Sequence, residues 1–318
     1  LGDKGTIVSG NSVFEVEDTQ KKLGDLFVHY GSVKTGEIKI NDVVEMKIDV
    51  ERRNNLKAYH SATHLLHESL RRTLGKHVMQ KGSLVAPDRL RFDFSHMKPI
   101  TNEELETIDK LVNEYVKNGS EVTTRIMTPK AAIEKGALAF FGEKYGEEVR
   151  VVSMGKEKDA YFSTELCGGT HVKNTGDIGK FKTVSQSSIA AGVRRVEALR
   201  DKQLEDFIKN KEKLSTLSVQ KDEETIKDLS SQIIKLGGKP KVDNKDLKEI
   251  IKNLSKQLEQ LNVNSVLQDK TKNIINDQKI KDIKVRFQKV QDLPPKDLRK
   301  LVDSGKKELG DGIVIVFA

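Results

Sequence analysis

Two pairs of possible metal ligands, far apart in the sequence, restrict how this chain can fold. His60 and His64 lie four residues apart in a stretch of helical periodicity, which places both imidazoles on one face of a helix. Cys167 and His171 have the same spacing, with two glycines between them. We expect those glycines to supply the positive φ angles of a tight turn that directs both side chains to one centre. The fold must therefore bring the helix and the turn together if the two pairs act on one ion.

Neither pair alone is a strong indication of a metal. Two histidines on a helix are more often solvated or hydrogen-bonded in a core, and the H-E-x-x-H pattern of metalloproteases is absent. Together the pairs supply one thiolate and three imidazoles, which Zn²⁺ binds readily in tetrahedral geometry. We therefore predict a Zn²⁺ site formed by His60, His64, Cys167 and His171. His67, on the same helix face, is expected to pack beside a ligand or support it.

Composition excludes some classes of protein and leaves others open. The 318 residues carry 56 basic and 48 acidic side chains, a net charge of +8, which suits a polyanionic partner but is equally explained by a lysine-rich surface. No apolar run approaches the ~20 residues that a membrane helix needs, and the first residues show no signal peptide. The single cysteine excludes an internal disulfide and suits a reducing, cytoplasmic compartment. The chain begins without Met, in what we expect to be the middle of a domain of a longer protein.

Periodicity predicts an α+β chain of several parts. Residues 1–48 alternate apolar and polar residues in short strands, which indicates a partial β-barrel. Helical spacing at 56–74, ended by Gly75, and at 102–117, capped by Thr101 or Asn102, predicts two helices in the next part. A strand is expected at 90–96, with others near 121–127 and 148–153 and a helix from Pro129. The predicted parts are a partial β-barrel at 1–48, an α+β domain that carries the predicted Zn²⁺ site at 49–200, a helical hairpin or coiled coil at 201–270 and a partial C-terminal α/β domain at 271–318.

The second half of the chain has a different pattern. Polar helical residues at 200–236 are followed by a break at 237–240 and then by an apolar seam. Its heptad spacing favours an antiparallel hairpin of two helices. A strand at 282–288, a helix at 295–308 after two prolines, and a strand at 312–318 complete the chain. The last strand is apolar on both faces, so we expect it to have partners on both sides. The seam consists of Leu247, Ile251, Leu254, Leu258 and Leu261.

The chain contains five motifs that are informative together: His60-Ser-Ala-Thr-His-Leu-Leu-His, Gln80-Lys-Gly-Ser-Leu-Val, Arg91-Phe-Asp-Phe-Ser-His, Leu166-Cys-Gly-Gly-Thr-His-Val and Gly192-Val-Arg-Arg-Val-Glu-Ala. These motifs resemble the editing domain of alanyl-tRNA synthetase, so the part at 49–200 is expected to be a zinc-dependent editing domain. The opening Leu1-Gly-Asp-Lys-Gly is similar to the end of a glycine-rich motif in the barrel that precedes this domain, and the order of the later parts agrees along the whole chain. The resemblance implies that the part that ligates alanine to tRNA(Ala) with ATP lies outside this sequence.

The resemblance implies a substrate and roles for further residues. A site that selects alanine cannot strongly reject serine or glycine, so a second site hydrolyses Ser-tRNA(Ala) and Gly-tRNA(Ala). In the family, Thr63 would sense the seryl side chain and Gln80 would bind the amino acid or the 3′ end. Arg91, Arg194 and Arg195 would contact tRNA. Two structural alternatives stay open: Thr63 could hydrogen-bond within its helix, and Arg194 and Arg195 could pair with Glu197.

The role of the metal and the context of the chain also stay open. Zn²⁺ could activate water, or a complete set of four protein ligands could leave it to shape the pocket. The chain could also be a free-standing deacylase of the same superfamily, or a non-catalytic zinc-stabilised module that binds tRNA. The resemblance implies a homodimer formed through a further C-terminal part.

Overall fold

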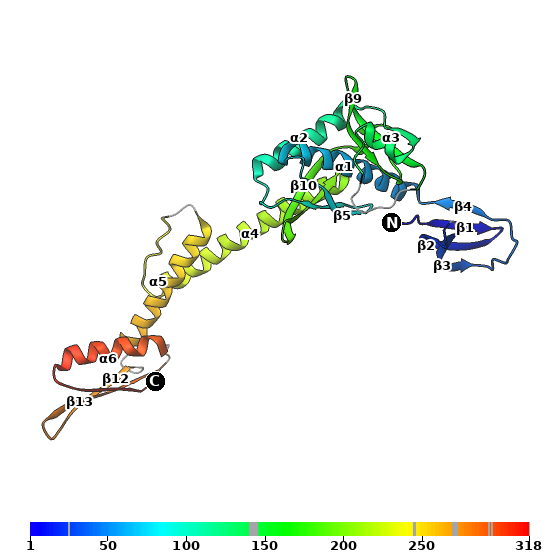
Figure 1. The fold of residues 1–318 in the computed structure, drawn as a ribbon. Helices are drawn as coiled ribbons and strands as arrows, with labels where there is room; N and C mark the ends of the chain where they lie inside the picture. The colour runs from blue at the N-terminus through cyan, green and yellow to red at the C-terminus, as the bar shows by residue number, and fades with distance from the viewer. Residues whose placement is uncertain are drawn as a thin grey trace. The chain divides into compact units, whose positions relative to one another are not determined.

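The computed structural model describes residues 1–24, 26–139, 146–243, 246–268, 273–291, 293 and 295–317. The chain divides into two compact units, Leu1–Lys209 and Asn210–Ala318 (Figure 1). Both units mix helices with sheets, so the predicted α+β class is confirmed. The expected domain bounds at residues 48, 200 and 270 stay predictions. Within the described ranges, no helix is both long and apolar enough to cross a membrane.

The first sheet of unit 1 is antiparallel and has the strand order β3-β2-β1-β4. Residues 37–40 lie in the stretch predicted to form short strands but are not a strand, because the backbone N–H groups of Glu37 and Lys39 donate to the side chains of Ser12 and Asp42 instead of to a partner strand. Asp25, in the same stretch of predicted strands, lies outside the described residues. Strands β3 and β4 form the two edges of this sheet as described, so a barrel stays a prediction. The strands are β1 (Gly5–Ser9), β2 (Ser12–Lys22), β3 (Leu26–Thr35) and β4 (Glu45–Ile48).

Two helices and a second sheet form the main core of unit 1. Helix α1 begins where Asp49 accepts a hydrogen bond from the N–H of Arg52, and it ends before Gly75, as predicted. The capping box of Thr101 and Glu104 begins α2, which confirms Thr101 as its cap. Both helices pack on the sheet of order β10-β11-β6-β5 around buried aromatic side chains such as Tyr59 and Phe92. The elements are α1 (Val50–Leu74), α2 (Asn102–Asn118), β5 (Gln80–Val85), β6 (Leu90–Ser95), β10 (Phe181–Ala190) and β11 (Val193–Arg200).

A third sheet in unit 1 positions the segment that carries Cys167. Its strand order is β7-β8-β9, and α1 contacts β9. Strand β9 was not predicted from the sequence; it ends immediately before Cys167. The short helix η1 (Thr175–Ile178) follows His171. The remaining elements are β7 (Thr123–Met127), α3 (Pro129–Glu134), β8 (Val149–Glu157) and β9 (Ala160–Leu166).

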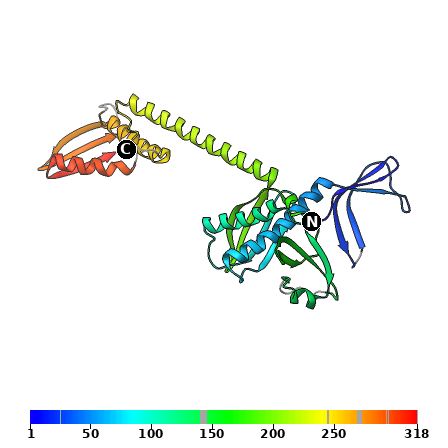
Figure 2. The same cartoon turned by 90° about the horizontal axis from the view of Figure 1, so that it is seen from above.

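Helices α4 (Asp201–Lys235) and α5 (Leu247–Gln268) run in the same direction within unit 2. The prediction of an antiparallel hairpin is therefore wrong. Gly238, just beyond α4, lies against the second half of α5: a Cβ added there would be 2.5 Å from Cδ1 of Leu261. The connection then returns along α5, where Gln257 donates to the carbonyl of Lys239 at 2.7 Å and accepts from the N–H of Lys241 at 3.4 Å. Both views show this return (Figures 1 and 2).

The physical reason is that heptad spacing selects the apolar face of a helix but not the direction of its partner. An extended connection gains about 3.3 Å per residue, whereas a helix rises about 1.5 Å per residue. The connection between Lys235 and Leu247 therefore has enough residues to run back along much of α5. The seam forms as expected, except that Ile250 rather than Ile251 enters its buried cluster.

The last part of unit 2 is a three-stranded sheet with one helix. Strands β12 (Asn273–Ile280) and β13 (Ile283–Val290) are antiparallel, and β14 (Gly312–Phe317) joins β13 in parallel after α6 (Pro295–Leu309). Among the described residues β14 pairs on one side only, and its side chains alternate between half-buried and exposed. The predicted pairing on both sides is therefore not observed there. Pro294 and Ala318 lie outside the described residues.

Candidate metal centre

The four predicted ligands converge in unit 1. His60 and His64 come from α1, and Cys167 and His171 come from the segment after β9. One ligand atom from each of the four lies within 4.8 Å of the others. The ring centroids of His60 and His171 are 4.4 Å apart, and Nε2 of His60 lies 3.4 Å from Sγ of Cys167. The predicted meeting of the two sequence pairs is therefore observed.

The backbone holds Cys167 in place against β8. Its N–H donates to the carbonyl of Arg150 at 2.9 Å, and its own carbonyl accepts from Nε of Arg150 at 3.0 Å. The N–H of Gly169 lies 3.5 Å from Sγ of Cys167 and donates to it. A donor aimed at sulfur favours the thiolate form, which is the form that binds metals.

Buried nitrogen atoms without partners indicate that the centre fits a cation. His64 is 3% exposed, and its Nδ1 lies 2.7 Å from Oε2 of Glu165. Nδ1 of His171 lies 3.2 Å from Oγ of the buried Ser61. Nε2 of both histidines is buried and has no hydrogen-bond partner among the described residues. Each ring is thus held through one nitrogen while the other is left free for a ligand bond, as is usual for metal-bound histidine.

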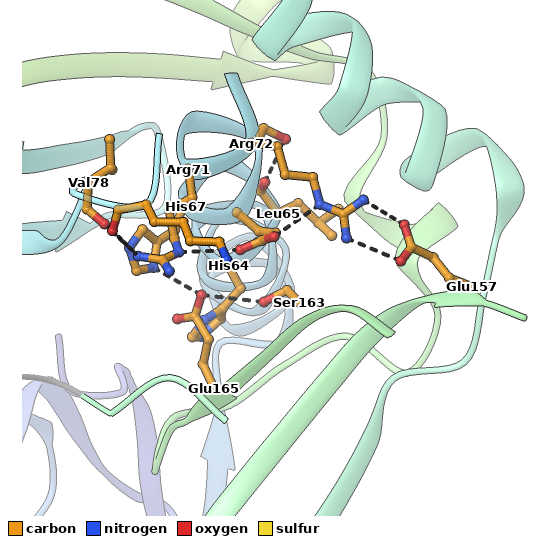
Figure 3. A network of polar contacts seen from close by, with 12 residues as sticks. His64, Leu65, His67, Arg71, Arg72, Val78, Glu157, Ser163 and Glu165 are labelled. Atoms are coloured by element: carbon orange, nitrogen blue, oxygen red, sulfur yellow. Dashed lines mark hydrogen bonds and ion pairs between the residues drawn. The ribbon is translucent and has the colours of Figure 1, made fainter. Parts of the chain in front are cut away.

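Glu165 joins His64 to His67 in a buried network (Figure 3). Oε1 of Glu165 lies 3.0 Å from Nδ1 of His67 and accepts from the hydroxyl of Ser163 at 3.4 Å. His67 lies outside the four-residue cluster, with its ring centroid 5.2 Å from that of Phe92. This placement agrees with the expected packing or supporting role of His67.

Sequence reasoning missed the two groups that orient the ligands. Glu165 lies two residues before Cys167, and Ser61 follows His60 directly. Ser61 also accepts from the N–H of Val172 at 3.2 Å, so it ties α1 to the segment that carries His171. A polar residue on the inner face of a strand next to a ligand motif would have been the signal for Glu165. That signal could not be used, because strand β9 itself was not predicted.

The surroundings of Cys167 and His171 favour the deprotonated form of both side chains. Burial raises the pKa of Cys167, but the neighbouring imidazoles of His171, His60 and His64 outweigh it and bring the pKa to about 3. Burial lowers the pKa of His171 to about 4. Burial also opposes ionisation of Glu165, yet the charges of His64 and His67 lower its pKa overall. A thiolate and a neutral imidazole are the forms that bind Zn²⁺.

The two glycines between Cys167 and His171 do not have the role that we expected. Neither Gly168 nor Gly169 has a positive φ angle, so that prediction is wrong. A Cβ added at Gly169 would lie 2.0 Å from Cε1 of His60, whereas nothing lies within 4 Å of one added at Gly168. Glycine is required at 169 because the His60 ring passes directly over the backbone, a close approach that the spacing alone does not reveal.

Thr63 and Gln80, the two residues expected to recognise the amino acid, both lie in unit 1. Thr63 is 4% exposed, and its hydroxyl donates to the carbonyl of Tyr59 at 2.8 Å, which is the intrahelical bond considered as its structural alternative. Gln80 is half-buried at the start of β5, opposite Phe94 of β6. These contacts leave the functional roles of Thr63 and Gln80 as predictions.

The three arginines lie on adjacent strands β6 and β11. Arg195 makes two hydrogen bonds to Asp93, at 2.6 and 2.8 Å, and not the pair with Glu197 that was the open alternative; Glu197 instead accepts from Ser185. The reason is register: residue 195 stands directly opposite residue 93 across the strand pair. Arg194 donates to Gln186 at 3.2 Å, and Nε of Arg91 lies 3.7 Å from Oδ2 of Asp93.

Comparison with known proteins identifies the class first. Residues 149–197 match the family described as the threonyl and alanyl tRNA synthetase second additional domain. This segment holds β8, β9, Cys167 and His171, and it therefore contributes half of the candidate centre. Residues 149–197 are thus similar to an additional domain found in threonyl and alanyl tRNA synthetases.

Whole-chain comparison then specifies the relatives. The chain is 43% identical over 325 aligned residues to alanine–tRNA ligase of Parvibaculum lavamentivorans, with 100% of this chain and 35% of the relative covered. It is 44% identical over 324 residues to the alanine–tRNA ligase of Rhodopseudomonas palustris, covering 100% of the chain and 36% of that relative. The chain is therefore a homologue of the alanine–tRNA ligases along its whole length, and it spans about a third of the length of these curated relatives.

Proposed function

We propose that this chain hydrolyses the ester bond of tRNA(Ala) that carries serine or glycine. The observation that carries the proposal is the convergence of His60, His64, Cys167 and His171 beside a segment that matches a synthetase additional domain. Homology to alanine–tRNA ligases supports tRNA(Ala) as the nucleic acid. Ligation of alanine with ATP would belong to a longer protein that contains this chain.

The proposed resident metal is Zn²⁺, held by the one thiolate and three imidazoles. When bound, Zn²⁺ supplies positive charge that can polarise an ester carbonyl or a water molecule. Because four protein ligands complete a tetrahedral set, we favour a role in shaping and orienting the pocket. In this role Ser61 and Glu165 fix the rings of His171 and His64, so that the pocket keeps one shape.

Further residues take proposed roles toward the substrate. Thr63 would contact the seryl side chain and Gln80 the amino acid or the 3′ end of the tRNA. The Thr63 hydroxyl donates its hydrogen bond to the backbone carbonyl of Tyr59, so toward a substrate it would act as an acceptor. Arg91, Arg194 and Arg195 would contact tRNA, with Arg195 held in place by Asp93.

The decisive experiment measures amino acid released from Ser-tRNA(Ala), Gly-tRNA(Ala) and Ala-tRNA(Ala) by the intact chain. We expect release of serine and glycine, little release of alanine, and loss of release in the Cys167→Ala variant. Tight binding of tRNA(Ala) without release of serine would contradict the proposal and favour the non-catalytic tRNA-binding module.

A further inference from the structure

A cavity of about 440 Å³ adjoins the candidate metal centre on the side of His171. The cavity opens between the start of α1 and the segment that runs from His171 to η1. Two of its lining residues are lysines, and one is a ligand of the candidate centre. The lining residues are Asn54, Lys57, His171, Val172, Lys173 and Asp177.

Most of the polar side chains that line this cavity have no hydrogen-bond or ion-pair partner among the described residues. Within the described ranges of the chain, the side chains of Lys57, Lys173 and Asn54 form no hydrogen bond or ion pair. The one carboxylate, Asp177, accepts from the N–H of Asn174 at the start of η1. The cavity is therefore lined by two ammonium groups and one amide without a partner among the described residues. Its one carboxylate, Asp177, already caps η1.

The same segments that carry the ligands hold the two lysines. Lys57 lies one turn before His60 and Ser61 on α1, and residues three and four apart share a helix face. Lys173 follows His171 by two residues, and its backbone carbonyl accepts from the N–H of Val122 at 2.9 Å. The backbone that carries each lysine is therefore fixed relative to the candidate centre.

We propose that Lys57 and Lys173 bind the phosphodiester next to the esterified ribose of the tRNA 3′ end. This inference rests on the proposed function. The ester in an aminoacyl-tRNA lies on the terminal ribose, so the phosphodiester on the 5′ side of that ribose must accompany the ester into the site. A phosphodiester carries one negative charge and accepts hydrogen bonds, which suits two ammonium groups and the amide of Asn54. Contacts of this kind position a nucleic acid without reading its sequence.

The test compares two serine esters that differ in their phosphates. Ser-tRNA(Ala) contains the phosphodiester, whereas 3′-O-seryladenosine has the same ester and ribose and lacks every phosphate. The variants are Lys57→Met and Lys173→Met, singly and together, with Lys110→Met on the exposed face of α2 as the matched control. A Met side chain keeps the length and removes the charge.

We expect the double variant to raise KM for Ser-tRNA(Ala) by about tenfold or more, with kcat nearly unchanged, because a lost charged contact weakens binding by about this factor. Hydrolysis of 3′-O-seryladenosine should equal that of the wild type. The control should match the wild type on both esters. Equal losses on both esters would overturn the inference, since the lysines would then act on the ester itself; no change on either ester would also overturn it.

A binding measurement separates this inference from the proposed function. The affinity for uncharged tRNA(Ala) is measured against salt concentration, where each lost phosphate contact makes the log–log slope shallower by about 0.7 to 0.9. We expect a shallower slope in the two lysine variants and an unchanged slope in Lys110→Met. If the wild type hydrolyses neither ester, the proposed function fails, and unchanged salt slopes would overturn the lysine site by themselves.

Discussion

Glu165, at the end of β9, holds His64 of α1 through a 2.7 Å contact between Oε2 and Nδ1. Both side chains are buried, and the same carboxylate also reaches His67. This pairing fixes the ring of His64 so that Nε2, which has no partner among the described residues, is the nitrogen available to a metal. The orientation of one ligand is therefore set by a residue outside the ligand set.

Glu165→Gln should weaken Zn²⁺ binding by about 10- to 100-fold, because an amide accepts from histidine less strongly than a carboxylate and does not favour one ring orientation. Competition with a chromophoric chelator gives the affinity. Glu157→Gln, in the same β8–β9 hairpin but paired with Arg72, is the matched control and should keep the wild-type affinity. A folded Glu165→Gln protein with unchanged affinity would contradict the role assigned to Glu165.

The two neighbouring glycines allow a paired steric test. Gly169→Ala should strongly reduce Zn²⁺ binding, because the new Cβ would lie 2.0 Å from Cε1 of His60 and one of the two must move. Gly168→Ala should bind Zn²⁺ like the wild type, because the space there is open. Bound zinc is measured by elemental analysis of both purified variants. Equal zinc content in the two variants would show that His60 does not depend on this close approach.

The sequence predicted the convergence of the four candidate ligands better than it predicted their surroundings. His60 and His64 share a helix face because helical periodicity is local, and Cys167 and His171 share a segment because they are four residues apart. The contact of Glu165 with His64 is different, since it depends on how β9 packs against α1. Gly169 shows the same limit: its need for glycine comes from the position of a ring that belongs to another element.

The features of the fold likewise divide into those that the sequence predicts and those that it does not. The cap at Thr101 and the end of α1 at Gly75 follow from neighbouring residues, and both were predicted. The direction of α5 relative to α4 was not predicted, because the heptad leucines specify a contact face, whereas the path of the connection through Lys239 and Lys241 decides the direction. Sequence periodicity is thus informative within an element and weak between elements.

Cys167→Ala should reduce bound zinc to a small fraction of one equivalent, since it removes the only thiolate and leaves three imidazoles. His67→Phe should keep close to one equivalent, because His67 lies outside the ligand cluster and its ring packs beside Phe92. Elemental analysis after dialysis compares the two. Full zinc retention in Cys167→Ala would remove Cys167 from the ligand set, and zinc loss in His67→Phe would show that His67 supports the centre more directly.

Arg72 and Glu157 give a prediction on pH and stability that does not involve the metal (Figure 3). Two nitrogens of Arg72 donate to the carboxylate oxygens of Glu157, at 2.7 and 3.1 Å. These hydrogen bonds, with a further one from Tyr115, lower the pKa of Glu157 in the folded protein. A carboxylate whose folded pKa is lowered stabilises the fold fully above its unfolded pKa of about 4.3, and this stabilisation is lost as the pH falls through the folded pKa.

Glu157→Gln should therefore lower the free energy of unfolding at pH 7 by at most about 1 kcal/mol, a small value because both partners are about one-third exposed and water screens the pair. The difference between wild type and variant should shrink as the pH falls below about 4, where the wild-type carboxyl becomes protonated. Urea unfolding at a series of pH values measures it, with Glu106→Gln on the exposed face of α2 as a control that should show little difference at any pH. A stability difference that grows toward low pH would have the wrong sign for a lowered pKa and would refute the ion pair as its source.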